Sequence, residues 1–107
     1  ELYDAFSFQG LIWLESLGFC KGGEAPKLVD EGVTEVSGDL PSIPLEEYYD
    51  KPGGLTAMIR VAEATLQVMG KAGNQVPDAE VALAHGWGGA INFQDVMILS
   101  SSPSIKK

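Results

Sequence analysis

The chain has 107 residues, which is enough for one domain with a modest hydrophobic core. Hydrophobic residues make up 45% and charged residues 21% of the sequence, a composition typical of globular proteins that excludes a disordered chain. Seven Lys and Arg against fifteen Asp and Glu give a net charge of -8, which disfavours nucleic acid and anionic membrane surfaces as partners.

Targeting and redox signals are weak. No apolar run approaches the roughly 20 residues that a membrane-spanning helix needs, and the first residues lack the basic-then-apolar pattern of a signal peptide. The single cysteine, Cys20, cannot form an internal disulfide or a metal cluster. We interpret it as a small buried hydrophobic residue, with a reactive thiol as the alternative. The sequence therefore predicts a cytoplasmic protein without a metal site or a membrane partner.

The first half of the chain contains one predicted helix and two irregular segments. Apolar residues crowd two adjoining faces of Phe6–Leu17, and Gly18 follows as a C-cap, so we expect a largely buried helix there. Residues 20–37 show little periodicity and contain Gly-Gly and Pro26, which indicates an irregular excursion with at most a short strand. Residues 38–54 hold three prolines and are predicted to form a long loop, a kind of segment that is often functional.

A second helix is predicted over Leu55–Met69, where apolar residues recur at steps of three and four until Gly70. Its N-terminus follows Lys51-Pro52-Gly53-Gly54, so free N–H groups and the positive end of the helix dipole face that segment. An anion or an enolate would suit this place. The alternative is an ordinary amphipathic helix that packs on a sheet, followed by a turn at residues 71–78.

A hairpin is predicted at the end of the chain. The apolar run Val81–Ala84 ends at His85, the only histidine, and is followed by the glycine-rich residues 86–89 and a second apolar run, Val96–Leu99. We expect a buried strand, a glycine turn and a returning strand. Glycines at a strand end let the backbone approach a ligand closely. Their N–H groups are then free to stabilise negative charge that develops on the ligand during a reaction. His85 would lie at this mouth as a site residue, or would be merely hydrogen-bonded within the hairpin.

Tyrosines are the candidate acid–base groups of the first half. Tyr3 and Asp4 lie at the entry to the first helix, and Tyr48 and Tyr49 lie in the long loop. The unperturbed pKa of a tyrosine is about 10, so it lies closer to the pKa of an alcohol than the pKa of a carboxylate does. A positioned tyrosine can therefore exchange a proton with a hydroxyl group. Lys51 is placed to lower the pKa of a loop tyrosine. The alternative is that both loop tyrosines cover the surface.

Five motifs resemble the C-terminal region of thiolase-superfamily proteins of the sterol-carrier or lipid-transfer type: ELYDAF, LESLGFCKGGE, SGDLP, KAGNQVPDAEVALAHGWGG and VMILSS. The resemblance implies an α/β fold, the C-terminal half of a thiolase fold, with a mixed sheet and layered helices. In that family a βαβαββ unit pairs with a similar N-terminal half that carries the nucleophilic cysteine. Residues 1–107 are therefore expected to form one C-terminal thiolase-like domain that is incomplete without that half.

The family's active-site motifs match only in part. Tyr3-Asp4-Ala5-Phe6 lies where thiolases have Asn-Glu-Ala-Phe, and residues 50–54 lie where the family has Gly-His-Pro. His85-Gly86-Trp87 replaces the Cys-x-Gly of typical thiolases and resembles the histidine of sterol-carrier-type members. Ordinary thiolytic cleavage is disfavoured, because its acid–base cysteine and its histidine would both be absent.

One branch of the superfamily fits better, namely thiolase-like aldolases that cleave steroid side chains as β-hydroxyacyl-CoA thioesters. The resemblance then implies that Tyr3 and either Tyr48 or Tyr49 move protons, while His85 and the glycine-turn N–H groups stabilise the enolate. Substrate-binding residues are expected at Asp4, Lys51, Gly53, Gly54, Gly86, Gly88 and Gly89.

The resemblance also implies partners. The expected substrate is a coenzyme A thioester with no bound cofactor, and the expected assembly is a homodimer that works with a small OB-fold, zinc-ribbon acyl-CoA-binding protein. Two other functions remain open. One is an acetyl-CoA C-acyltransferase of the sterol-carrier type, and the other is a non-catalytic thiolase-like scaffold subunit.

Overall fold

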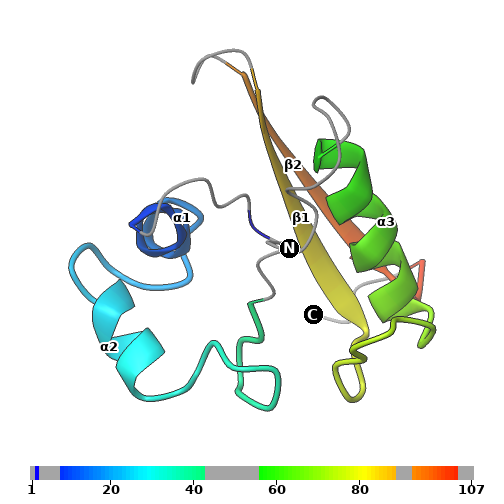
Figure 1. Cartoon of the computed structure of the whole chain (residues 1–107), viewed down its shortest axis with the longest axis horizontal. Helices are drawn as coiled ribbons and strands as arrows, with labels where there is room; N and C mark the ends of the chain where they lie inside the picture. Colours follow the sequence, from blue (N-terminus) through cyan, green and yellow to red (C-terminus); the bar gives the residue numbers. More distant parts are fainter. Residues whose placement is uncertain (1, 3–7, 43–55, 89–92, 104–107) are drawn as a thin grey trace.

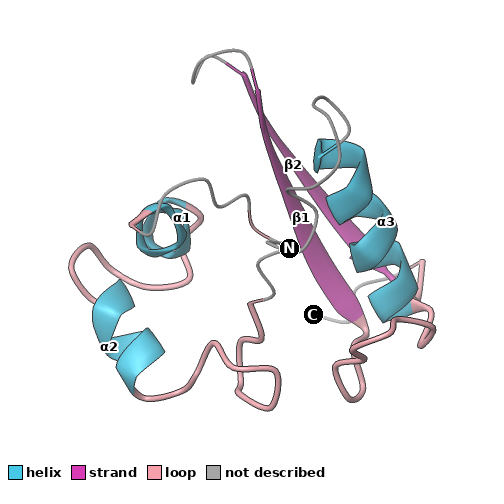
Figure 2. Ribbon diagram, in the orientation of Figure 1, coloured by secondary structure: helices cyan, strands magenta, loops and turns pink. Residues whose placement is uncertain are grey.

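The computed structural model describes residues 2, 8–42, 56–88 and 93–103 of the chain. Within these residues the element order is α1 (Gln9–Ser16), α2 (Ala25–Asp30), α3 (Thr56–Val68), β1 (Val81–Gly88) and β2 (Phe93–Ser100). The two strands form an antiparallel hairpin. Helix α3 lies along one side of this hairpin, and the α1–α2 segment lies on the other side (Figures 1 and 2).

Helix α1 confirms the first predicted helix, although it is shorter than Phe6–Leu17. It ends at a left-handed glycine, Gly18, with a φ of +81°, as the C-cap prediction requires. The expectation of a largely buried helix is wrong for one of its two apolar faces. Leu14 is buried in a cluster with Leu2 and Ala25, whereas Ile12 on the other face is 45% exposed.

Helix α2 corrects the prediction of an irregular excursion with a short strand at residues 20–37. Pro26 occupies the first turn of this helix, where its missing N–H costs nothing and its fixed φ suits the helix. The buried Ala25 joins the helix to the α1 cluster, and a short i,i+4 ion pair links Lys27 to Glu31 at 3.7 Å. A six-residue helix is too short to show apolar periodicity in the sequence.

Helix α3 confirms the second predicted helix, and Gly70 follows it in the left-handed conformation with a φ of +67°. Its sheet-facing side packs mainly on β1 and includes the buried Ala64. The buried guanidinium of Arg60 donates Nε–H to the carbonyl of Leu2 at 3.2 Å, which ties the start of the chain to this helix. The helix therefore connects the N-terminal part of the chain to the hairpin.

The hairpin corrects the expected position of the glycine turn. Residues pair in an unbroken register from Val81 opposite Ser100 to Gly88 opposite Phe93. Gly86 and Gly88 are therefore strand residues, and His85 lies inside β1 rather than at the mouth of a turn. The antiparallel pair is the whole sheet among the described residues, so the parallel strands of a mixed sheet are not among them.

The long loop predicted at residues 38–54 is described only as far as Ser42. This first part is held by backbone hydrogen bonds from Leu40 N–H to the Val33 carbonyl and from Ser42 N–H to the Thr34 carbonyl, both 3.0 Å. Residues 43–55, with Tyr48 and Tyr49, lie outside the described residues. None of the helices in the described ranges is long and apolar enough to cross a membrane.

Candidate functional site

His85 is the one predicted catalytic residue within the described residues, and its side chain is 1% exposed. The imidazole Nε2 lies 2.9 Å from Oε1 of Gln94 on β2. His85 pairs directly with Val96, so Gln94 is its diagonal neighbour on the same face of the hairpin. The indole ring of Trp13, from α1, lies against the imidazole with centroids 4.5 Å apart and planes inclined by 51°.

This arrangement fixes the histidine ring. Because Oε1 of Gln94 is an acceptor, Nε2 carries the proton in this pairing, with the amide in the orientation observed. The geometry is that of a histidine hydrogen-bonded within a hairpin, which is the second of the two sequence interpretations. A direct role in catalysis stays a prediction, because His85 is buried in this structure.

The glycines next to His85 take part in the hairpin. Ser101 N–H donates to the carbonyl of Glu80, its direct partner across the hairpin, at 3.0 Å. Because hydrogen-bonding direction alternates along antiparallel strands, Gly86 and Gly88 also direct their N–H groups toward β2. Their expected role at an enolate stays a prediction, and it would require these ladder bonds to open.

The remaining predicted site residues lie outside the described residues: Tyr3, Asp4, Tyr48, Tyr49, Lys51, Gly53, Gly54 and Gly89. Their approach to His85 around a common cavity therefore stays a prediction.

Cys20 lies in the turn after α1, half-buried against the core cluster. Partial burial raises the pKa of its thiol above the ordinary value, and the nearby carboxylates of Glu15 and Glu24 raise it further. A raised pKa lowers the thiolate fraction at neutral pH and so disfavours a nucleophilic role. This position supports the interpretation of Cys20 as a packing residue rather than as a reactive thiol.

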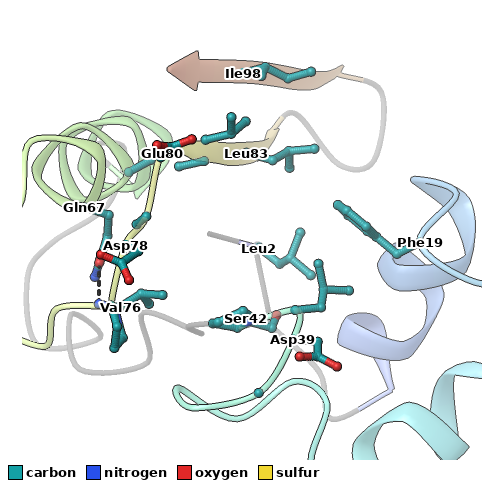
Figure 3. Close-up of a pocket in the computed structure, with 18 of the residues that line it drawn as sticks. Leu2, Phe19, Asp39, Ser42, Gln67, Val76, Asp78, Glu80, Leu83 and Ile98 are labelled. Atoms are coloured by element: carbon teal, nitrogen blue, oxygen red, sulfur yellow. Dashed lines mark hydrogen bonds between the residues drawn. The ribbon is translucent and has the colours of Figure 1, made fainter. Parts of the chain in front are cut away.

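A cavity of about 630 Å³ opens between the N-terminal segment and the start of β1. Figure 3 shows Leu2 and Phe19 on one side of it and Leu83 on the strand opposite. Carboxylates of Asp39, Asp78 and Glu80 also line it. The apolar walls suit an uncharged group, and the carboxylates disfavour the phosphates of coenzyme A. His85 is not among the lining residues, so the cavity is separate from the histidine.

Sequence reasoning missed Gln94 and Trp13 as the partners of His85. Gln94 could have been found from the register of the hairpin, because it lies two residues before the direct partner of His85 on β2. Trp13 carried no such signal, since its contact depends on how α1 packs against β1. No group of three or more His, Cys, Asp or Glu side chains suited to a metal ion occurs within the described part of the chain.

Comparisons with known proteins match almost the whole chain. The family model described as thiolase C-terminal domain-like matches residues 1–101. An acetyl-CoA acetyltransferase of Methanothermobacter thermautotrophicus is 35% identical over 103 residues, which cover 94% of this chain and 27% of that protein. Human sterol carrier protein 2 is 41% identical over 96 residues, which cover 85% of this chain and 18% of that protein. The chain therefore spans about a quarter or less of the length of these relatives.

Proposed function

Because the chain belongs to the thiolase C-terminal domain-like family, we propose that it forms part of an enzyme that acts on acyl-CoA thioesters. The similarity to an acetyl-CoA acetyltransferase over 94% of the chain supports this substrate class. Since the chain spans 27% of that relative, the proposed enzyme includes further polypeptide that completes the fold and the site. The 107-residue chain alone is expected to show no turnover.

The proposed reaction is retro-aldol cleavage of a β-hydroxyacyl-CoA, with a steroid side chain as the substrate type. The observation that supports this proposal is the set formed by His85, where the thiolase motif has its acid–base cysteine, and the tyrosines Tyr3, Tyr48 and Tyr49. His85 by itself also fits the sterol-carrier type, so the tyrosines are what favour the aldolase. The chain's single thiol, Cys20, is half-buried with a raised pKa and is no substitute for that cysteine. Retro-aldol cleavage needs no thiol nucleophile, so this set of residues is compatible with it.

In the proposed step a base removes the proton of the β-hydroxyl, its oxygen becomes a carbonyl, and the bond between the α and β carbons breaks. The electron pair of that bond forms the enolate of the shorter thioester, which then takes up a proton to give an acyl-CoA. Tyr3 and one of Tyr48 and Tyr49 are the proposed proton carriers. His85, held by Gln94, is the proposed group beside the enolate.

A second candidate is acyl transfer, which the named activity of the archaeal relative favours. Thiolysis breaks a β-ketoacyl-CoA with one molecule of free coenzyme A and yields two thioesters. The nucleophilic cysteine would then come from polypeptide outside this chain, because Cys20 is packed beside α1. A non-catalytic scaffold subunit is the third candidate, since such a subunit would also lack the catalytic residues of the thiolase motifs.

The proposed assembly is a cytoplasmic homodimer that works with an OB-fold, zinc-ribbon acyl-CoA-binding protein. The homodimer is proposed from the resemblance to the thiolase superfamily, whereas support for the OB-fold partner comes from the aldolase interpretation alone. The OB-fold partner therefore depends on the outcome of the assay that follows.

The test is an assay of the complete protein with a β-hydroxyacyl-CoA and, separately, with a β-ketoacyl-CoA plus free coenzyme A. The proposal predicts equal amounts of a carbonyl product and a shorter acyl-CoA from the first substrate, without consumption of free coenzyme A. Cleavage of only the second substrate, with one coenzyme A consumed per turnover, would establish acyl transfer instead. No cleavage of either substrate, with the OB-fold partner present or absent, would favour the scaffold.

A further inference from the structure

Arg60 is a charged residue in the interior of the molecule. Its side chain is 5% exposed on the buried side of α3, which it shares with the apolar Ala64 and the amide Gln67. Removing a guanidinium from water is unfavourable unless hydrogen bonds compensate for the loss. An apolar side chain would fill this position of an amphipathic helix without that cost. Arginine at this position is therefore best explained by what its side chain binds.

The hydrogen bond of Arg60 joins two distant parts of the chain. Its Nε–H donates to the carbonyl of Leu2 at 3.2 Å, across 58 positions of the sequence. Leu2 is itself buried in a cluster with Leu14 of α1 and Ala25 of α2. Leu2 is therefore held by packing on α1 and α2 and by a hydrogen bond from α3.

Leu2 directly precedes Tyr3, the first of the proposed proton carriers. The carbonyl that Arg60 binds belongs to the peptide bond between these two residues. Because a peptide bond is planar, a hydrogen bond to its oxygen also restrains the nitrogen and the Cα atom of the residue that follows. Tyr3 itself lies outside the described residues. Arg60 therefore acts on the peptide group that leads into Tyr3.

We propose that Arg60 is a positioning residue for Tyr3, an inference that rests on the proposed retro-aldol function. By holding the Leu2 carbonyl, Arg60 limits the positions from which Tyr3 reaches the substrate hydroxyl. Proton transfer depends steeply on such placement, since a displacement of about 1 Å can reduce a rate about 100-fold. Arg60 does not carry the proton itself, because a guanidinium stays protonated in proteins.

Two substitutions of similar length separate the hydrogen bond from the charge. In Arg60→Gln the amide Nε2 follows Cδ directly, as Nε does in arginine, so a donor is kept at the same place along the side chain. Arg60→Met has a similar length and no donor. Both substitutions remove the charge and the rest of the guanidinium. A difference between them therefore reports the hydrogen bond to the Leu2 carbonyl.

The assay is cleavage of a β-hydroxyacyl-CoA by the complete protein, with kcat and KM measured separately. Arg60→Met should reduce kcat by about 10-fold or more with little change in KM, because the interaction that it disturbs serves proton transfer rather than substrate binding. Arg60→Gln should keep kcat close to that of the wild type. An unchanged kcat in Arg60→Met would overturn the proposal. An equal loss in both variants would also overturn it, because the charge or another contact of the guanidinium would then be responsible.

A double-mutant cycle tests whether Arg60 acts through Tyr3. If it does, Arg60→Met should cause no further loss of kcat in a Tyr3→Phe background, because the hydroxyl that Arg60 positions is gone. Gln67→Met is the matched control, since Gln67 lies on the same helix, is also 5% exposed and bonds to residues 74 and 76 instead of the chain start. Its effect on kcat should be the same in both backgrounds. If Arg60→Met also lowers kcat by the same factor in both backgrounds, its role is merely structural and the proposal is overturned.

Folding and the proposed function are controlled separately. Circular dichroism at the assay temperature checks that each variant is folded. If Arg60→Met is unfolded there, Arg60→Gln decides alone: a kcat close to that of the wild type supports the proposal, and a loss as large as that of Tyr3→Phe overturns it. No cleavage by the wild type, or cleavage by Tyr3→Phe at the wild-type rate, would refute the proposed function and the positioning role with it. An impaired Tyr3→Phe variant with independent effects in the cycle would refute only the role of Arg60.

Discussion

Gln67→Met tests how the end of α3 is joined to the start of β1. The Gln67 side chain is 5% exposed and bonds to two backbone groups of the following turn. Its Nε2 donates to the Asn74 carbonyl at 2.8 Å, and its Oε1 accepts from Val76 N–H at 2.9 Å, the bond drawn in Figure 3. Methionine has a similar length and helix propensity but cannot replace either bond.

The expected loss of stability follows from those two backbone groups. Leaving a buried donor or acceptor without a partner costs about 1–3 kcal/mol. Both bonds are partly buried, so the low end applies to each, and the sum is about 2 kcal/mol. For a domain of this size that loss corresponds to a fall of roughly 8 °C in Tm.

Urea unfolding followed by circular dichroism measures this change at one fixed protein concentration. Leu66→Met is the matched control, because Leu66 is the preceding residue on α3 and is 38% exposed. Its effect should stay within about 0.5 kcal/mol of the wild type. If Gln67→Met unfolds at the same urea concentration as the control, the turn does not depend on Gln67 and the reasoning is refuted.

Further expected outcomes concern the left-handed glycine, the thiol and the buried histidine. Gly18→Ala should destabilise the chain by about 1 kcal/mol in urea unfolding because Gly18 has a positive φ, whereas Gly22→Ala, with equal space for a methyl group, should not. The rate at which iodoacetamide alkylates Cys20 should rise with pH, with a midpoint above that of a free cysteine, and Glu15→Gln should lower this midpoint. A midpoint at or below the value of a free cysteine would contradict the raised pKa. Gln94→Leu removes the hydrogen bond to the imidazole and should cost about 1–2 kcal/mol of unfolding free energy, and an unchanged value would mean that water replaces the amide.

Elements with a strong local signal were predictable from the sequence. The apolar spacing of Met58, Ile59 and Leu66 predicted α3, and Gly18 and Gly70 marked the ends of two helices because left-handed backbone favours glycine. Helix α2 was missed because Pro26 was interpreted as a breaker, whereas proline is tolerated in the first turn of a helix. Local composition alone does not distinguish these two roles of proline.

Features that depend on pairing between distant residues were not predictable. Gly86 and Gly88 have turn-like composition, but their opposite residues on β2, Asp95 and Phe93, extend the hairpin through them. The sequence placed His85 at the mouth of a turn, whereas this register places it inside a strand. Its hydrogen bond to a neighbour was anticipated as one of two interpretations, but the identity of that neighbour required the register.

The most direct test of the proposed function is the rate at which tyrosine variants of the complete protein cleave a β-hydroxyacyl-CoA. Tyr→Phe removes only the hydroxyl, so the change at Tyr3 and at one of Tyr48 and Tyr49 should reduce cleavage by about 100-fold or more, the scale of a lost acid–base group, with substrate affinity little changed. The other loop tyrosine serves as the matched control. Cleavage at the wild-type rate by Tyr3→Phe and by the double variant at residues 48 and 49 would contradict the tyrosine mechanism.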